Sequence, residues 1–131
     1  MNLLMTPPPQ DQDWEFNFAY NRVRHLLKNR FGTPGLPGLD TMLFLIGVQE
    51  LGRWRTDFTK EEKRDLMHIA VCRLLSYDGH YEFGGRDADG WPHFSLIKPV
   101  PKRPLDEQEA LLKRHIVQYF DDLEKQEGQL D

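Results

Sequence analysis

The stretch T-M-L-F-L-I-G-V-Q-E-L, residues 41–51, decides the fold, because its apolar side chains point in nearly every direction around a helix. A helix that is apolar all round belongs in the interior, so we expect this one to be the most buried helix of the protein. Asp40, directly before it, is expected to cap its first turn. Gly47 lowers helix propensity by about 1 kcal/mol relative to alanine, so its presence predicts a close crossing with another helix.

Two further helices flank this segment in the sequence. One is expected to begin after Asp13, as its N-cap, and to end near Arg30. The other is expected over residues 60–76, because Thr59 and Glu62 have the spacing of a capping box. Both carry apolar residues at helical spacing: Phe16, Ala19, Tyr20, Val23, Leu26 and Leu27 in the first, and Leu66, Met67, Ala70, Val71, Leu74 and Leu75 in the second.

The apolar period changes to two between residues 80 and 97, which predicts an antiparallel β-hairpin. We expect the two strands to be joined by a four-residue turn, residues 87–90. The second choice is a two-residue Asp89-Gly90 turn, which would place the same side chains on each face of the hairpin. The expected cross-strand pairs are Phe83 with Phe94 and Tyr81 with Leu96 on the core face, and Arg86 with Trp91 on the other face.

A last helix is expected over about residues 105–126, with one apolar stripe and an acidic polar side. The fold class is therefore mainly α, of the α+β kind: a four-helix domain with one hairpin, at about residues 80–97, between the third and fourth helices. We assign residues 13–127 to this single domain and residues 1–12 to a disordered, Pro-rich N-terminal tail.

Composition sets the broad class of the protein. Of its 131 residues, 39 % are hydrophobic and 29 % are charged, a balance that excludes global disorder and a membrane-spanning segment. The single cysteine, Cys72, excludes an intramolecular disulfide, and the N-terminal segment lacks the basic start of a signal peptide. We expect a cytoplasmic protein with no membrane partner.

Charge is unevenly distributed along the chain, although the net charge is only −4. Residues 22–64 carry a net charge of +4 and residues 105–131 a net charge of −5. Solvated helix faces explain this pattern most simply. The sharper interpretation is a head-to-tail attraction between copies of the chain, or a weak anion-facing surface.

Catalytic candidates are few. No nucleophile, metalloprotease or phosphate-loop motif is present, so we name only the titratable residues Glu50, His68 and His93, which would meet in a cleft between the third helix and the hairpin. Glu50 is also expected to pair with Arg53, Arg55 or Arg73. His68 and Cys72 have the spacing of two metal ligands, but two ligands do not make a site, and no metal or cofactor is predicted.

Candidate partner-binding residues are the large aromatic residues outside the expected core face, together with an arginine beside one of them. Trp14 and Phe18 form a second apolar stripe on the first helix, which predicts a homodimer. The full set is Trp14, Phe18, Arg86, Trp91 and Phe120.

The order of three helices, a hairpin and a long helix resembles that of the winged-helix transcription regulators over residues 13–126. In that family the third helix enters the DNA major groove, the hairpin is the wing and the last helix dimerises. Two departures oppose DNA binding: acidic Glu61, Glu62 and Asp65 on the third helix, and Asp87 and Asp89 at the wing tip. A noncatalytic protein-interaction or adaptor protein is the leading hypothesis, a DNA-binding regulator the second, and a small enzyme or ligand-binding protein using the cleft the third.

Overall fold

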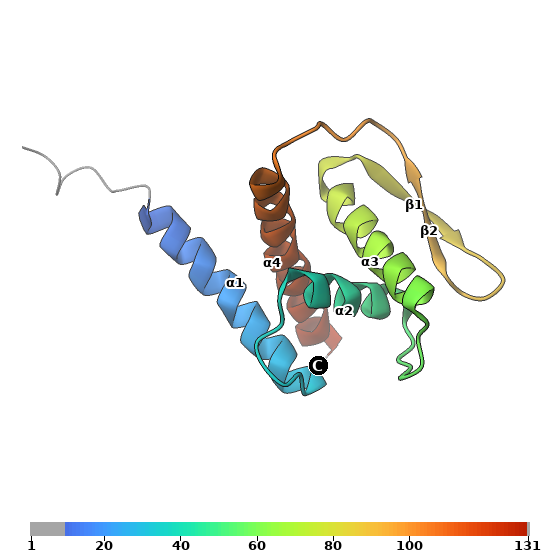
Figure 1. Ribbon diagram of the computed structural model, residues 1–131, viewed down its shortest axis with the longest axis horizontal. Helices are drawn as coiled ribbons and strands as arrows, with labels where there is room; N and C mark the ends of the chain where they lie inside the picture. Colours follow the sequence, from blue (N-terminus) through green and yellow to red (C-terminus); the bar gives the residue numbers. More distant parts are fainter. Residues whose placement is uncertain (1–9, 131) are drawn as a thin grey trace, which may run out of the picture.

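The computed structural model describes residues 10–130 and contains, within them, four α-helices, a short 3-10 helix and one two-stranded hairpin (Figure 1). This confirms the expected fold class. The elements are α1 (Gln10–Phe31), α2 (Leu39–Leu51), α3 (Lys60–Leu75), η1 (Ser76–Asp78), β1 (Tyr81–Arg86), β2 (Pro92–Leu96) and α4 (Leu105–Leu130). None of the described helices is long and apolar enough to cross a membrane.

Helix starts differ from the expected ones at two places. Helix α1 begins at Gln10, so Asp13 lies inside the helix rather than at its N-cap; the rest of the expected tail, residues 1–9, lies outside the described residues. Helix α2 begins after Gly38, which caps it without a side chain, and Asp40 lies in the first turn. A carboxylate is favourable there too, because it faces the positive end of the helix dipole, so an acidic residue alone does not fix the first residue.

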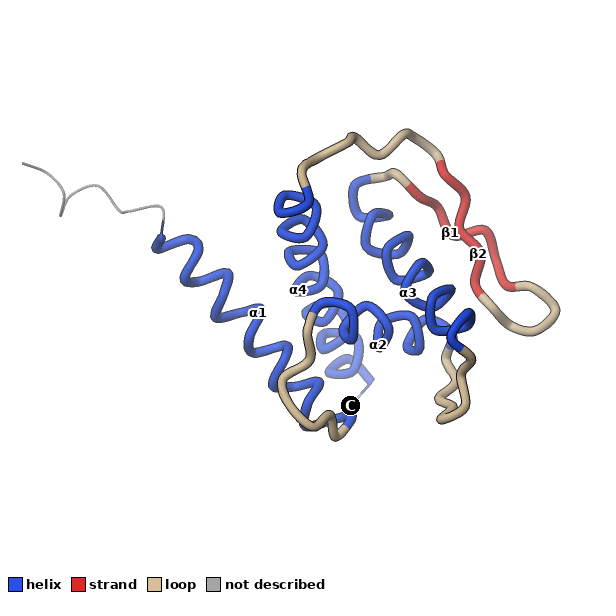
Figure 2. Tube along the Cα trace, in the orientation of Figure 1, coloured by secondary structure: helices blue, strands red, loops and turns tan. Residues whose placement is uncertain are grey.

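Helix α2 is the centre of the molecule, as its sequence predicts. Met42 and Ile46 are fully buried, and α2 crosses between α1, α3 and α4 (Figure 2). Gly47 contacts the backbone of Leu66 in α3, where a Cβ atom would overlap the Leu66 carbonyl group. The expected close helix crossing is therefore the one between α2 and α3.

Helix α3 begins with the expected capping box. The Thr59 hydroxyl accepts a hydrogen bond from the Glu62 backbone N–H, and the Glu62 carboxylate accepts one from the Thr59 N–H. The helix ends at Leu75 and is continued by η1, and Gly79 then turns the chain into the hairpin with a positive φ of 76°. This connection places the two strands alongside α3.

The hairpin has the expected register at its open end, where Tyr81 pairs with Leu96 and Phe83 with Phe94. A bulge between Phe83 and Arg86 shifts the register, so Arg86 lies opposite Pro92 and not opposite Trp91. The expectation that this face is buried is also wrong in part: Phe83 is 54 % and Leu96 57 % exposed. The hairpin packs beside α3 through both of its strands, but these two side chains stay largely in water.

Helices α1 and α4 form the other side of the molecule. They converge at the C-terminal end of α1, whereas the N-terminal end of α1 projects from the body (Figure 1). Two ion pairs join them, Arg22 with Glu124 and Arg30 with Glu127. The basic half of α1 is thus partly neutralised by the acidic end of α4 within one chain.

Candidate functional site

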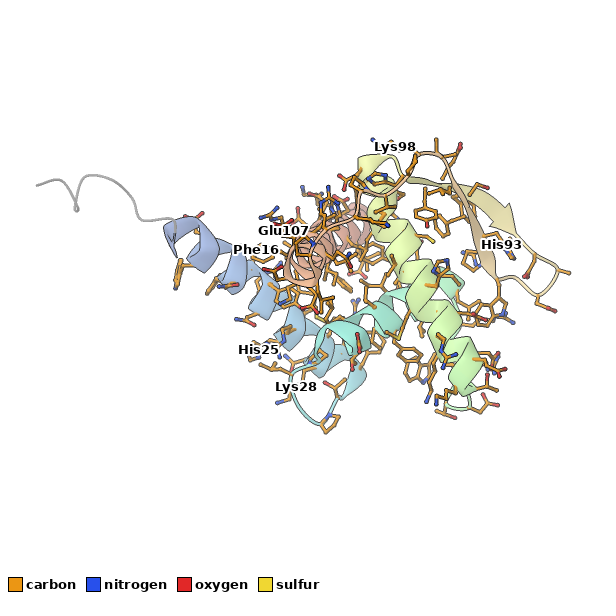
Figure 3. The ribbon with its side chains drawn as sticks, turned by 45° about the horizontal axis from the view of Figure 1, so that its top comes forward. Phe16, His25, Lys28, His93, Lys98 and Glu107 are labelled. Carbon is orange, nitrogen blue, oxygen red and sulfur yellow. The ribbon has the colours of Figure 1, made fainter. Side chains whose placement is uncertain are left out.

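A groove of about 510 Å³ lies between α3, from Glu62 to Cys72, and the turn and second strand of the hairpin. This is the cleft that the sequence predicts, and Figure 3 marks His93 on its hairpin side. The lining residues are Glu62, Asp65, His68, Ile69 and Cys72 from α3, and Asp87, Asp89, Trp91, Pro92, His93 and Phe94 from the hairpin.

Asp87 organises the hairpin side of the groove. One oxygen of its carboxylate accepts hydrogen bonds from the backbone N–H groups of Asp89 and Trp91, at 2.9 and 3.0 Å. The other oxygen lies 2.9 Å from His93 Nε2. The bond to His93, followed by those to the backbone, lowers the pKa of Asp87 below its usual value of 3.8. The turn is therefore held by an ionised carboxylate.

Two arginines fasten this turn to the end of α2. The Arg86 guanidinium donates to the carbonyl oxygens of Glu50, at 2.7 Å, and Leu51, at 3.3 Å, and also to that of Gly90. Arg53 donates to the Asp89 carbonyl oxygen. Carbonyl groups in the last turn of a helix lack partners within the helix, and a cation is favourable beside them. The N–H groups of Arg86, a predicted partner-binding residue, hold the hairpin in place.

The α3 side begins with a second fixed carboxylate. Arg55 donates two hydrogen bonds to Glu62, at 3.0 and 3.2 Å, and Glu62 also accepts from the backbone N–H of Thr59. The bond from Thr59 and the bonds from Arg55 lower the pKa of Glu62. Glu62 is therefore already neutralised by a neighbour.

Of the four carboxylates that line the groove, Asp65 and Asp89 are the two without an ion-pair partner in the described part of the chain. Both are exposed, and they stand on opposite sides of the groove, on α3 and on the hairpin turn. Among the described lining residues there is no lysine or arginine. The groove therefore presents a negative field with two carboxylates available to a ligand.

The apolar part of the groove is formed by Trp91, Phe94 and Ile69. Trp91 and Phe94 are half-buried, because one side of each ring packs on the second core cluster, which is Val48, Leu51, Phe58, Leu66 and Ile69. Phe94 also meets Phe83 edge to face, with 5.7 Å between ring centroids. The two rings are thus fixed in position and still present a surface to the groove.

His68 and Cys72 lie next to each other on α3, with 3.5 Å between Nε2 and Sγ. Cys72 is 2 % exposed, and burial raises the pKa of its thiol to about 11. A thiol that stays protonated at neutral pH is a poor nucleophile and a poor metal ligand. Within residues 10–130, no three His, Cys, Asp or Glu side chains are placed to hold a metal ion together.

Glu50, the third catalytic candidate, is not in the groove. Its carboxylate accepts a 2.6 Å hydrogen bond from the Tyr119 hydroxyl and lies 3.5 Å from Arg73 Nε. The expected ion pair with an arginine is confirmed, with Arg73 as the partner. The structure thus brings His68 and His93 to one groove and places Glu50 on the side of α2 that faces α4. Sequence spacing could not show this, because the three residues lie on three elements.

The remaining partner-binding candidates divide in two. Trp14 and Phe18 are 66 % and 62 % exposed and stack on each other at 5.7 Å between ring centroids. Phe120 is 4 % exposed and lies in the main core, so it presents almost none of its side chain to a partner in this structure. Phe120 and Leu105 share the apolar stripe of α4, but Leu105, at the start of the helix, is 70 % exposed.

Sequence reasoning missed the two free carboxylates as a pair. A signal was present on α3, where Glu62, Asp65, Ile69 and Cys72 recur every three or four residues and therefore share one face. No signal indicated that Asp89 stands across from them, since that depends on the bulge and on Arg86. Comparisons with protein-family models, curated proteins and solved structures found no match.

Proposed function

We propose that this protein is a noncatalytic interaction protein whose groove between α3 and the hairpin binds a basic, extended segment of a partner protein. The observation that carries the proposal is the composition of the groove: two free carboxylates, Asp65 and Asp89, on either side of the Trp91 and Phe94 rings, with no lysine or arginine among the described lining residues.

Each part of the groove matches a part of such a ligand. Lysine or arginine side chains of the partner would pair with Asp65 and Asp89, and an intervening proline or aliphatic side chain would pack on Trp91 and Phe94. Aromatic-lined grooves are suited to Pro-rich segments, because these are already extended and lose little conformational freedom on binding. The volume of the groove is also within the range of sites for small ligands and short peptide segments.

A rigid frame supports binding rather than catalysis. Arg86, Arg53 and Asp87 fix the hairpin turn through bonds to backbone groups, so the groove is formed before a ligand arrives. His93 is held by Asp87 in the way that a general base is held. However, Cys72 is the only nucleophilic thiol in the lining, and it is buried and protonated. The proposal therefore places the enzyme hypothesis behind binding.

DNA binding, the second hypothesis, would use the same face, since α3 and the hairpin are the elements that contact DNA in the winged-helix regulators. Here that face carries the groove carboxylates, which repel phosphate groups. We expect no duplex binding tighter than about 10 µM at physiological salt, the nonspecific range. Submicromolar, salt-sensitive binding to genomic fragments, lost in a Lys63→Glu/Arg64→Glu variant, would overturn this ranking.

The exposed Trp14–Phe18 pair supports a second element of the proposal, a homodimer. Two stacked aromatic side chains at the projecting end of α1 leave a large apolar area in water. In sedimentation at tens of micromolar we expect a dimer that Phe18→Glu weakens. A strictly monomeric profile would contradict this element and leave the groove proposal untouched.

The groove is tested with a library of fluorescent heptapeptides that alternate Pro with Lys, Arg and aliphatic residues, read by fluorescence anisotropy. We expect micromolar binding that weakens at least tenfold in Asp65→Lys and in Asp89→Lys. The matched control is Glu61→Lys, which makes the same charge change on α3 at a residue outside the groove. An affinity that is unchanged in all three variants, or reduced equally in all three, would contradict the proposal.

A further inference from the structure

The connection between β2 and α4, residues 98–104, has the sequence K-P-V-P-K-R-P and is named the strap here. Its prolines fix φ at three positions, and the residue before each proline is restricted to extended conformations. The sequence thus holds six of the seven residues in or near an extended form. In agreement, the strap contains no helix or strand, and all of its residues except Arg103 are exposed.

The strap is also the most basic exposed connection of the chain. Lys98, Lys102 and Arg103 have no ion-pair partner in the described part of the protein. Val100 stands between them and is 37 % exposed. An extended backbone with cations around an apolar residue and prolines is the kind of ligand that the groove favours on chemical grounds.

We propose that the strap of one copy of this protein binds in the groove of a second copy. Lysine and arginine side chains of the strap pair with Asp65 and Asp89, and Val100 with its flanking prolines packs on Trp91 and Phe94. This inference rests on the proposed function, because it names a second copy of the chain as one partner of the same groove.

The strap cannot reach the groove of its own chain. It begins beyond the open end of the hairpin, whereas Asp89 lies in the turn before β2, and the five residues of β2 alone span about 17 Å at roughly 3.4 Å per residue. Figure 2 shows the strap leaving β2 and crossing directly to the start of α4. Because it is tied at both ends, the strap meets a groove only between molecules.

Each copy offers one groove and one strap, so two copies can exchange them reciprocally in a two-fold dimer, or successive copies can join head to tail. Assembly therefore grows with protein concentration. A basic partner segment competes with the strap for the groove, so self-association sets how much of the protein is free to bind a partner.

The test uses the full chain with Phe18→Glu as background, so that α1 makes no dimer. A groove variant carries Asp65→Asn and Asp89→Asn; a strap variant carries Lys98→Gln, Lys102→Gln and Arg103→Gln. We expect the background protein to exceed the mass of a monomer in sedimentation as concentration rises. Each variant alone stays monomeric, and an equimolar mixture forms a 1:1 heterodimer, because one intact groove and one intact strap remain.

Circular dichroism and thermal melts establish that the variants fold, and the exposed Glu61→Gln, made in the background protein, is the control that must still self-associate. A background protein that stays monomeric up to about 1 mM, or a mixture that forms no heterodimer, overturns the inference. If library peptides still bind the groove in that case, the proposed function stands. If they do not bind either, both proposals fall.

Discussion

The two sides of α3 meet their neighbours in opposite ways. On the side facing α2, Leu66, Ala70 and Leu74 are fully buried, and Gly47 brings the two helix backbones into contact. On the side facing the hairpin, polar side chains follow one another along the helix, and a groove remains. Helix α3 is therefore packed tightly against α2, where Gly47 has no side chain. It is not packed tightly against the hairpin, where close packing would bury charged residues.

The hairpin is held by hydrogen bonds at its turn and by the packing of Trp91 and Phe94 on the second core cluster. Arg86 and Arg53 hold the turn to the end of α2, while the Phe83 and Leu96 side chains at the other end stay largely in water. A buried carboxylate without a partner would be costly, so a groove lined by Asp65 and Asp89 remains hydrated until a cation enters it.

The largest effect is expected from Gly47→Ala, which disrupts the tightly packed contact between α2 and α3. The added methyl group would overlap the Leu66 backbone, which cannot move away as a flexible side chain can. We expect a loss of about 2–3 kcal/mol in the free energy of unfolding, even though alanine is the better helix former. Urea denaturation measures this. Gly35→Ala, where no atom lies within 4 Å of the new Cβ, is the control; equal stability of the two variants would contradict the close crossing.

On the groove side of α3, Arg86→Ala should loosen the hairpin turn, because it removes three hydrogen bonds to carbonyl oxygens. The side chain is exposed, so we expect only about 1 kcal/mol of lost stability. Hydrogen exchange should instead report the change, with faster exchange at the amides of Asp89 and Trp91. Arg103→Ala, an arginine far from the turn, is the comparison. Unchanged exchange in Arg86→Ala would show that packing, and not Arg86, positions the hairpin.

The turn should also respond to acid. Because the folded pKa of Asp87 is lowered, its stabilising contribution is present above the usual value of 3.8 and is lost as the pH falls through the lower, folded value. We expect the Asp89 and Trp91 amide resonances to shift in that acid range in the native protein and not in Asp87→Asn. Asp121→Asn, on α4, should keep the native profile. The same acid shift in Asp87→Asn would assign it to another carboxylate.

The smallest effect is expected at Cys72, on the border between the two sides. Burial raises the pKa of this thiol to about 11, so at pH 7 to 8 it should react very slowly with a thiol-specific disulfide reagent. Full reaction should follow unfolding in guanidinium chloride. Rapid, complete labelling of the native protein would mean that α3 and the hairpin separate readily, and the groove would not be preformed.

The difference between the two sides of α3 is also a difference in how much the sequence could predict. The all-round apolar pattern of residues 41–51, the Gly47 crossing and the Thr59–Glu62 capping box are local, and each is confirmed. The open side depends on non-local geometry: a bulge moves Arg86 away from Trp91, and Arg86 then reaches the end of α2.

The exposed fraction of the apolar side chains could not be predicted either, for a related reason. The alternation Tyr81, Phe83 and Phe94, Leu96 correctly predicts a shared face, but the period of a strand does not tell how much of that face a neighbour covers. In the same way, the stripe on α4 predicts one apolar side without saying that Phe120 would fill the core while Leu105 stays in water.

The central claim is that the open side of α3 is a binding groove, and amide chemical-shift mapping tests it most directly. The full chain, labelled with nitrogen-15, is titrated with the tightest peptide from the basic library. We predict saturable shifts concentrated at Asp65, His68, Asp89 and the Trp91 indole N–H, absent in Asp65→Lys and retained in Glu61→Lys. Shifts confined to α1 or α4, or none at millimolar peptide, would contradict the claim.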